Sequence, residues 1–84
     1  MKLWMLTQND ITGYDTYDSC IVAANNDDEA RNIHPSGEVT NNFNPWKHSL
    51  YTWASSPDNV TVTCIGTAIK GTKAGIILVS FNAG

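Results

Sequence analysis

The sequence predicts an α+β fold: a four-stranded, mainly antiparallel sheet with one short helix, in the order strand, strand, helix, strand, strand. Three observations predict it. Four apolar runs of strand length are separated by polar segments. One intervening segment carries helix-capping residues, and only a short polar link joins the first two runs, as in an antiparallel hairpin. With 84 residues, the chain is expected to form a single domain, 1–84, of limited core size.

The first two strands are expected on either side of a turn. Residues 2–8 alternate apolar side chains on both faces, so we expect this strand to be covered on both sides. Residues 9–16 contain Asn-Asp and Thr-Gly steps, which favour turns. The second strand is expected at residues 17–24, where an apolar run resumes.

A short helix is expected at residues 27–34. Asn26 precedes Glu29 by three positions, which is close to a capping box, and acidic residues follow where the helix dipole is positive. The helix is expected to end before Pro35, because proline disfavours a helical conformation of the residue that precedes it.

The last two strands are expected at residues 60–68 and 74–81, with a turn at 71–73. The run at 74–81 is continuously apolar, which is typical of a central strand covered on both faces. Cys20 and Cys64 both lie in apolar runs, so two buried free thiols are expected and not a disulfide.

A long polar loop is expected at residues 36–59, and it contains Phe43, Trp46, Tyr51 and Trp53. Loops of this length in small domains are commonly functional or disordered, and four aromatic residues argue against disorder. Their flat faces suit the stacking of a nucleotide base. The same side chains could equally anchor a subunit interface.

Composition excludes several classes of function. The formal charge is −3, and the five basic residues are dispersed, so the basic stripe that binds long nucleic acid is missing. Two cysteines 44 positions apart and two histidines 14 apart do not fit a zinc site. We therefore expect no metal and no cofactor. Self-association is the remaining source of extra stability that we expect for so small a domain.

The amino-terminal apolar run is too short for a signal peptide or a membrane span, so a cytoplasmic protein with no membrane partner is expected.

The doubled Tyr-Asp step in residues 13–19 indicates a recognition surface. Phenols and carboxylates are poor core material, because each polar atom that leaves water needs a partner. Arg31 is the only guanidinium in the chain and suits a phosphate, although a pair with Asp27 or Asp28 would explain it equally well. The candidate ligand-binding residues are Asn9, Tyr14, Asp15, Tyr17, Asp18, Ser19, Arg31, His34, Lys47 and Trp53.

Catalytic arrangements are weakly represented. No nucleophile elbow of the Gly-x-Ser-x-Gly type and no glycine-rich phosphate loop is present in the sequence. His34 at the end of the expected helix is better explained by a favourable interaction with the helix dipole than by acid-base chemistry. We expect no catalytic residue. A small hydrolase that uses Asp15, Asp18 and His34 remains the enzymatic alternative.

Several segments resemble small tailed-phage proteins. These segments are Lys2-Leu3-Trp4-x-Leu6-Thr7-Gln8-Asn9, residues 13–19, Glu29-Ala30-Arg31-Asn32-Ile33-His34-Pro35, Trp53-Ala54-Ser55-Ser56-Pro57 and the terminal Ser80-Phe81-Asn82-Ala83-Gly84. Among such proteins the chain is similar to the anti-CBASS 4 group, which binds cyclic oligonucleotide immune signals without cleaving them. This resemblance implies a homo-oligomer, a tetramer or another symmetric assembly, in the cytoplasm of an infected bacterium. It carries no ligand motif residue by residue.

We therefore expect a non-enzymatic phage anti-defence protein that sequesters a small anionic ligand, a cyclic dinucleotide or trinucleotide. Tyr14, Tyr17 and Trp53 are expected to enclose the bases, and Arg31 with Lys47 or Lys70 to meet the phosphates. The alternative from a different class is a protein that inhibits a host protein by direct contact.

Overall fold

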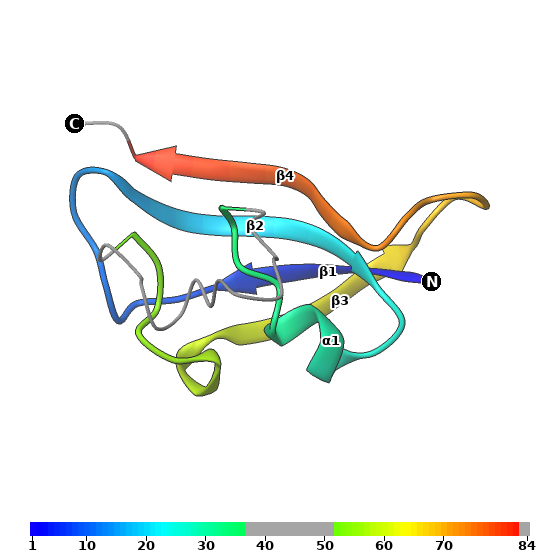
Figure 1. The fold of residues 1–84 in the computed structure, drawn as a ribbon, viewed down its shortest axis with the longest axis horizontal. Helices are drawn as coiled ribbons and strands as arrows, with labels where there is room; N and C mark the ends of the chain where they lie inside the picture. Colours follow the sequence, from blue (N-terminus) through cyan, green and yellow to red (C-terminus); the bar gives the residue numbers. More distant parts are fainter. Residues whose placement is uncertain (37–51, 83–84) are drawn as a thin grey trace, which may run out of the picture.

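The computed structural model describes residues 1–36 and 52–82, which form one antiparallel sheet with a short helix on one side (Figure 1). This arrangement confirms the predicted α+β class. The elements in chain order are β1 (Lys2–Thr7), β2 (Thr16–Ala24), α1 (Asp27–Arg31), a 3₁₀ turn η1 (Pro57–Asn59), β3 (Thr61–Thr67) and β4 (Gly75–Asn82).

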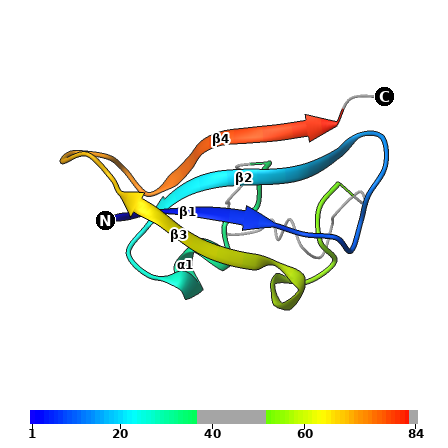
Figure 2. The same cartoon turned by 180° about the vertical axis from the view of Figure 1, so that it is seen from behind.

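The four strands lie in the order β3-β1-β2-β4, and every neighbouring pair is antiparallel. The prediction that the apolar run at 74–81 forms a central strand is wrong, because β4 is an edge strand. After β3, residues 68–74 pass the ends of β1 and β2, and β4 then pairs with the far side of β2 (Figures 1 and 2). Its continuous apolar run therefore borders the open side of the sheet.

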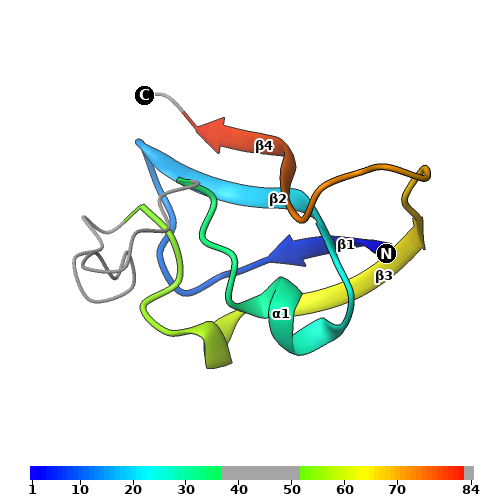
Figure 3. The ribbon, with the colours of Figure 1, turned by 45° about the vertical axis from the view of Figure 1, so that its right-hand side comes forward.

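The two faces of the sheet differ in their cover. On one face, Leu6 and Cys20 lie opposite each other and are buried under α1 and the segment 52–60 (Figure 3). On the other face, Met5 lies opposite Ile21 and is 37% exposed. The expectation that the first strand is covered on both sides is therefore wrong, since the single helix packs on one face only.

Helix α1 begins as predicted and ends earlier. The side chain of Asn26 accepts a hydrogen bond from the backbone N–H of Glu29 at 2.8 Å, and Glu29 Oε2 accepts one from the backbone of Asn25 at 3.1 Å. Asn32 ends the helix, because its side-chain amide donates to the Asp28 carbonyl at 2.8 Å. Such local bonds by asparagine compete with helix propagation, so the helix stops three residues before the predicted end.

The core lies between the sheet and the segment that leads into β3. Its fully buried large side chains are Trp53, Leu6 and Val22. Cys20 belongs to this core, whereas Cys64 on the edge strand β3 is exposed, so only one of the two predicted core thiols is buried. Both cysteines are free thiols, as expected.

Candidate functional site

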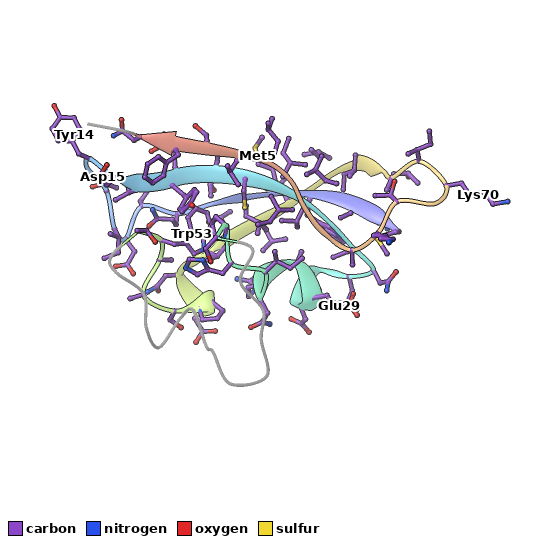
Figure 4. All side chains as sticks on the ribbon, turned by 45° about the horizontal axis from the view of Figure 1, so that its top comes forward. Met5, Tyr14, Asp15, Glu29, Trp53 and Lys70 are labelled. Atoms are coloured by element: carbon purple, nitrogen blue, oxygen red, sulfur yellow. The ribbon has the colours of Figure 1, made fainter. Side chains whose placement is uncertain are left out.

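The Tyr-Asp end is our name for residues 13–19 together with residues 80–82, where β2 begins and β4 ends. The register pairs Thr16 with Asn82 and Tyr17 with Phe81. Figure 4 shows Tyr14 and Asp15 at one end of the molecule and Lys70 at the other. The Tyr-Asp step therefore lies at a corner of the sheet, beside an edge strand.

The turn at this corner is fixed by its own hydrogen bonds. Gly13 and Asp15 have φ values of +120° and +59°, a region that glycine and, to a lesser degree, aspartate tolerate. The backbone N–H of Asp15 donates to the Asn82 carbonyl at 2.6 Å, and the side-chain amide of Asn82 donates to the Gly13 carbonyl at 2.7 Å. The Thr16 hydroxyl donates to the same carbonyl at 2.8 Å. The end of β4 thus holds the turn in place.

Part of the Tyr-Asp end is an accessible polar and aromatic surface, whereas Thr16 is buried and Tyr17 is half-buried against the core. Tyr14 is 78% exposed. The ring of Tyr17 packs against Phe81 with centroids 4.9 Å apart at an interplanar angle of 58°. Asp18 occupies a β-bulge between β2 and β4, and its Oδ2 accepts a hydrogen bond of 3.5 Å from the hydroxyl of Ser80. A bulge redirects side chains locally, which leaves this carboxylate exposed.

A buried glutamine organises the connection from β1 to this turn. Gln8 donates to the carbonyls of Ile11 and Tyr17 at 2.5 and 3.1 Å, and its Oε1 accepts from the backbone of Asp10 and Ile11 at 2.9 and 2.8 Å. Both ends of its amide are therefore satisfied while the side chain is 6% exposed. Asn9, the next residue, is exposed at this same end of the sheet.

The sequence did not indicate that the carboxylate of Asp10 accepts several hydrogen bonds from residues far away in the chain. Its Oδ2 accepts from the backbone N–H and the hydroxyl of Ser55 at 2.8 and 2.6 Å, and from the side chain of Asn59 at 3.1 Å. The hydrogen bond from the Ser55 hydroxyl is the largest of the effects that lower the pKa of this carboxyl. Asp10 thereby ties the turn after β1 to the segment before β3. The Asn-Asp step in the sequence indicates a turn, but it does not indicate that Asp10 binds Ser55 and Asn59.

Arg31 has a role in the fold that sequence reasoning did not find. Its Nη1 donates to the carbonyl of Val60 at 2.6 Å and to that of Pro57 at 3.4 Å. These bonds join the end of α1 to the 3₁₀ turn before β3. Pairing with Asp27 or Asp28 was the alternative explanation, whereas backbone carbonyls are the partners found.

Trp53 and His34 lie on the packed side of the sheet and not in the open Tyr-Asp end. Trp53 is fully buried, so its ring is a core element and offers no face for stacking on a ligand. His34 is 3% exposed, and its Nδ1 accepts from the backbone N–H of Ser36 at 3.1 Å. Burial lowers the pKa of this imidazole.

The remaining predicted residues divide into two groups. Tyr14, Asp15, Asp18 and Ser19 lie at the Tyr-Asp end with Asn9 at the same end of the sheet, whereas Tyr17, between them in the sequence, packs against the core. The residues Lys47, His48, Phe43, Trp46 and Tyr51 lie outside the described part of the chain. The β4 residues that complete the end, Ser80, Phe81 and Asn82, follow from a strand pairing that the sequence pattern did not fix.

The carboxylates of the Tyr-Asp end can accept hydrogen bonds, its hydroxyls can donate them, and the exposed ring of Tyr14 can stack on another flat group.

Within residues 1–36 and 52–82, no three His, Cys, Asp or Glu side chains are placed to hold a metal ion. A hollow of about 120 Å³ lies on the open face between β1, β2 and β4, lined by Met5, Ser19, Cys20, Ile21, Leu78, Val79 and Ser80. Ligand pockets usually have about 300–1,000 Å³, so this hollow is too small to enclose a nucleotide.

The fold is that of a small α+β domain with an exposed polar and aromatic corner. Comparison with protein-family models, with curated proteins and with solved structures finds no match for the chain. Among the described residues, no helix has the length and apolarity that are needed to cross a membrane.

Proposed function

We propose that this chain is a non-enzymatic phage protein that binds a small cyclic nucleotide immune signal at the Tyr-Asp end and sequesters it uncleaved. The observation that carries the proposal is the exposed ring of Tyr14 beside carboxylates and hydroxyls that the hydrogen-bonded turn holds in place. A surface that is fixed before binding loses little conformational freedom when a ligand arrives.

The chemistry of each group suits a part of such a ligand. The Tyr14 ring offers a flat face for a base, an interaction of about 1–3 kcal/mol. The carboxylates of Asp15 and Asp18 accept hydrogen bonds from base amino groups or ribose hydroxyls, and the hydroxyl of Ser19 can donate or accept. Acceptor carboxylates do not attract phosphates, so the cations that this ligand needs come from outside the Tyr-Asp end.

Binding is favoured over hydrolysis by the position of His34. A general base must reach the proton that it removes, within hydrogen-bond distance or through one water molecule. His34 is buried on the packed side of the sheet, whereas Asp15 and Asp18 are at an exposed corner. The acid-base set of the hydrolase alternative is therefore not assembled in the described residues.

The test is a binding screen followed by recovery of the ligand. Purified protein is titrated calorimetrically with cyclic dinucleotides and cyclic trinucleotides, and the bound fraction is then heat-denatured and chromatographed. We expect heat of binding with at least one ligand and release of that ligand intact. Cleaved product would support the hydrolase. No binding across the panel, together with one stoichiometric host protein in a pull-down, would support inhibition by direct contact.

A matched pair of variants locates the site. Tyr14→Ala should weaken binding about tenfold or more, because the stacking face is lost. Ile65→Ala removes an exposed apolar side chain from the opposite edge strand, where residue exposure is 47%, and should leave affinity unchanged. Equal affinities of wild type and Tyr14→Ala would exclude the Tyr-Asp end as the binding site.

A further inference from the structure

The outer edge of β4 lacks the features that normally protect an edge strand. In the part of the chain that the structure describes, β4 pairs with β2 on one side, and no strand pairs with its other side. Its residues, Gly-Ile-Ile-Leu-Val-Ser-Phe-Asn, include no charge and no proline. Soluble proteins usually protect an edge with lysine, proline or a covering segment, since unpaired N–H and C=O groups recruit another strand.

Apolar side chains follow this edge on both faces of the sheet. Leu78 lies opposite Ile21 on the open face, whereas Val79 lies opposite the core residue Cys20 on the packed face. Leu78 is 63% exposed and Phe81 45%. A partner that stacked on one face would cover only part of this surface. A strand that continues the sheet would flank both faces at once.

The exposed apolar area along β4 is similar to the apolar area that one partner contributes to a standard protein–protein interface. Four residues of β4 contribute, namely Ile77, Leu78, Val79 and Phe81. From their exposed fractions, and at roughly 150–250 Å² for a large side chain, they present on the order of 400 Å². A standard interface buries about 800 Å² on each partner, of which a little more than half is apolar. The edge therefore supplies about the apolar area that one copy contributes to a dimer.

Charge distinguishes the two ends of β4. Lys70 and Lys73 are exposed just before the strand begins, and Asp15 and Asp18 are exposed where it ends. Figure 4 shows Lys70 and Asp15 at opposite ends of the molecule. Two copies of β4 placed side by side and antiparallel bring the basic end of one copy next to the acidic end of the other. This arrangement is isologous, so the same complementary contact occurs twice.

We propose that two copies of this chain pair antiparallel through β4 to form one continuous eight-stranded sheet. Because directly opposed side chains of an antiparallel pair lie on the same face, the two-fold axis must pass at a residue position, and we place it at Leu78, near the middle of the strand, so that the Leu78 residues of the two copies oppose each other. Each Tyr-Asp end then lies beside Lys70 and Lys73 of the second copy. Where the proposed function also holds, these lysines supply the cations that the Tyr-Asp end lacks, so that each ligand site is built from both copies.

A zero-length cross-link reports this geometry directly. Carbodiimide joins a lysine amine to an aspartate carboxylate with loss of water, and needs the two groups in contact. The eight residues of β4 separate the two ends of one copy by roughly 25 Å at 3.2–3.4 Å per residue. A link from Lys70 or Lys73 to Asp15 or Asp18 must therefore join two copies. In a mixture of unlabelled and heavy-nitrogen protein, we expect this linked peptide in mixed-isotope form.

Two matched variants test the edge without any ligand. Leu78→Glu puts like charges next to the two-fold axis and should raise the dimer dissociation constant about tenfold or more and abolish the cross-link. Ile65→Glu makes the same change in β3 and should alter neither. Circular dichroism confirms that both variants fold, and analytical ultracentrifugation gives the oligomeric state.

The proposal is overturned by a monomeric wild type at high micromolar concentration, by a dimer without the cross-link, or by a Leu78→Glu protein that still dimerises. Its failure is distinguishable from that of the proposed function. A cross-linked dimer that binds no cyclic nucleotide would refute the ligand and keep the dimer. For a protein that does bind, Lys70→Gln with Lys73→Gln should weaken affinity about tenfold if the site is shared, and unchanged affinity would refute the shared site.

Discussion

The packed side of the sheet and the Tyr-Asp end use the same kinds of residue for different purposes. Trp53 and His34 are enclosed between the sheet and the segments beneath it, where an aromatic ring and an imidazole fill space. Tyr14 and Asp15 stand on a hydrogen-bonded turn where almost nothing covers them. Burial, and not residue type, decides which of these side chains contributes to folding and which is free to meet a partner.

The packed side and the Tyr-Asp end also differ in the interactions that stabilise them. The packed side depends on apolar contact among core residues, supplemented by the bonds from Arg31 to the carbonyls of Pro57 and Val60. The Tyr-Asp end depends on backbone bonds to Asn82 and on the Gln8 amide, so its exposed side chains, such as Tyr14 and Asp15, can change with little loss of packing. Substitutions should therefore affect stability on one side and recognition on the other.

The largest expected effect is the loss of a buried ring. Trp53→Ala should lower the free energy of unfolding by about 3–5 kcal/mol, because it leaves a cavity in the core. A domain of this size has only about 4–13 kcal/mol in total. Urea denaturation followed by circular dichroism measures the change.

The control is Tyr14→Ala, which removes an aromatic ring from a residue that is 78% exposed. It should change the free energy of unfolding by less than about 0.5 kcal/mol. Similar losses for the two variants would contradict the division between packed side and Tyr-Asp end.

The sequence predicted local features well, because they depend on neighbouring residues. The Asn26 cap, the turn at Gly13 and the alternation in β3 are all read within a few positions. The order of the strands depends on which edges meet in space. An apolar run such as Gly75–Asn82 fits a central strand and an uncovered edge equally well. Trp53 shows the same limit of sequence-based prediction, since an indole ring is equally suited to a buried core and to a ligand-binding site.

A second, smaller effect follows from the pH dependence of the packed side. Burial lowers the pKa of His34 below its ordinary value near 6.5. As the pH falls below about 6.5, the unfolded chain binds a proton that the native protein does not, so stability decreases until the pH reaches the native pKa. Above about pH 6.5 this contribution is complete and constant. Urea midpoints between pH 7.5 and 5 should show the decline.

His34→Gln should remove this slope whatever it does to the overall stability. His48→Gln, at a position outside the described residues, is the matched control and should keep the slope. The carboxyl of Asp10 affects stability in a separate, lower pH range. Its pKa is lowered in the native protein, so the stabilisation that it provides is lost only as the pH falls below about 4. A wild-type slope that survives in His34→Gln would assign the titration to another group.

The smallest expected effect on stability comes from modification of an exposed thiol. Cys20 is 2% exposed, and burial raises its pKa to about 12, whereas Cys64 is exposed on β3. Since the thiolate is the reacting form, iodoacetamide at pH 8 should alkylate Cys64 alone in the native protein and both cysteines in urea. Mass spectrometry of the peptides identifies the modified residue. Alkylation of Cys64 should leave the urea midpoint unchanged.

Slow labelling of Cys20 in the native protein then measures the opening of the packed side. A buried thiol reacts only from conformations that expose it, so its labelling rate follows the free energy of that opening. Trp53→Ala should raise this rate by orders of magnitude and leave the rate at Cys64 unaltered, while Tyr14→Ala should change neither. Equal native labelling rates at Cys20 and Cys64 would mean that the packed side opens as readily as the edge, which contradicts the burial of the core beneath α1.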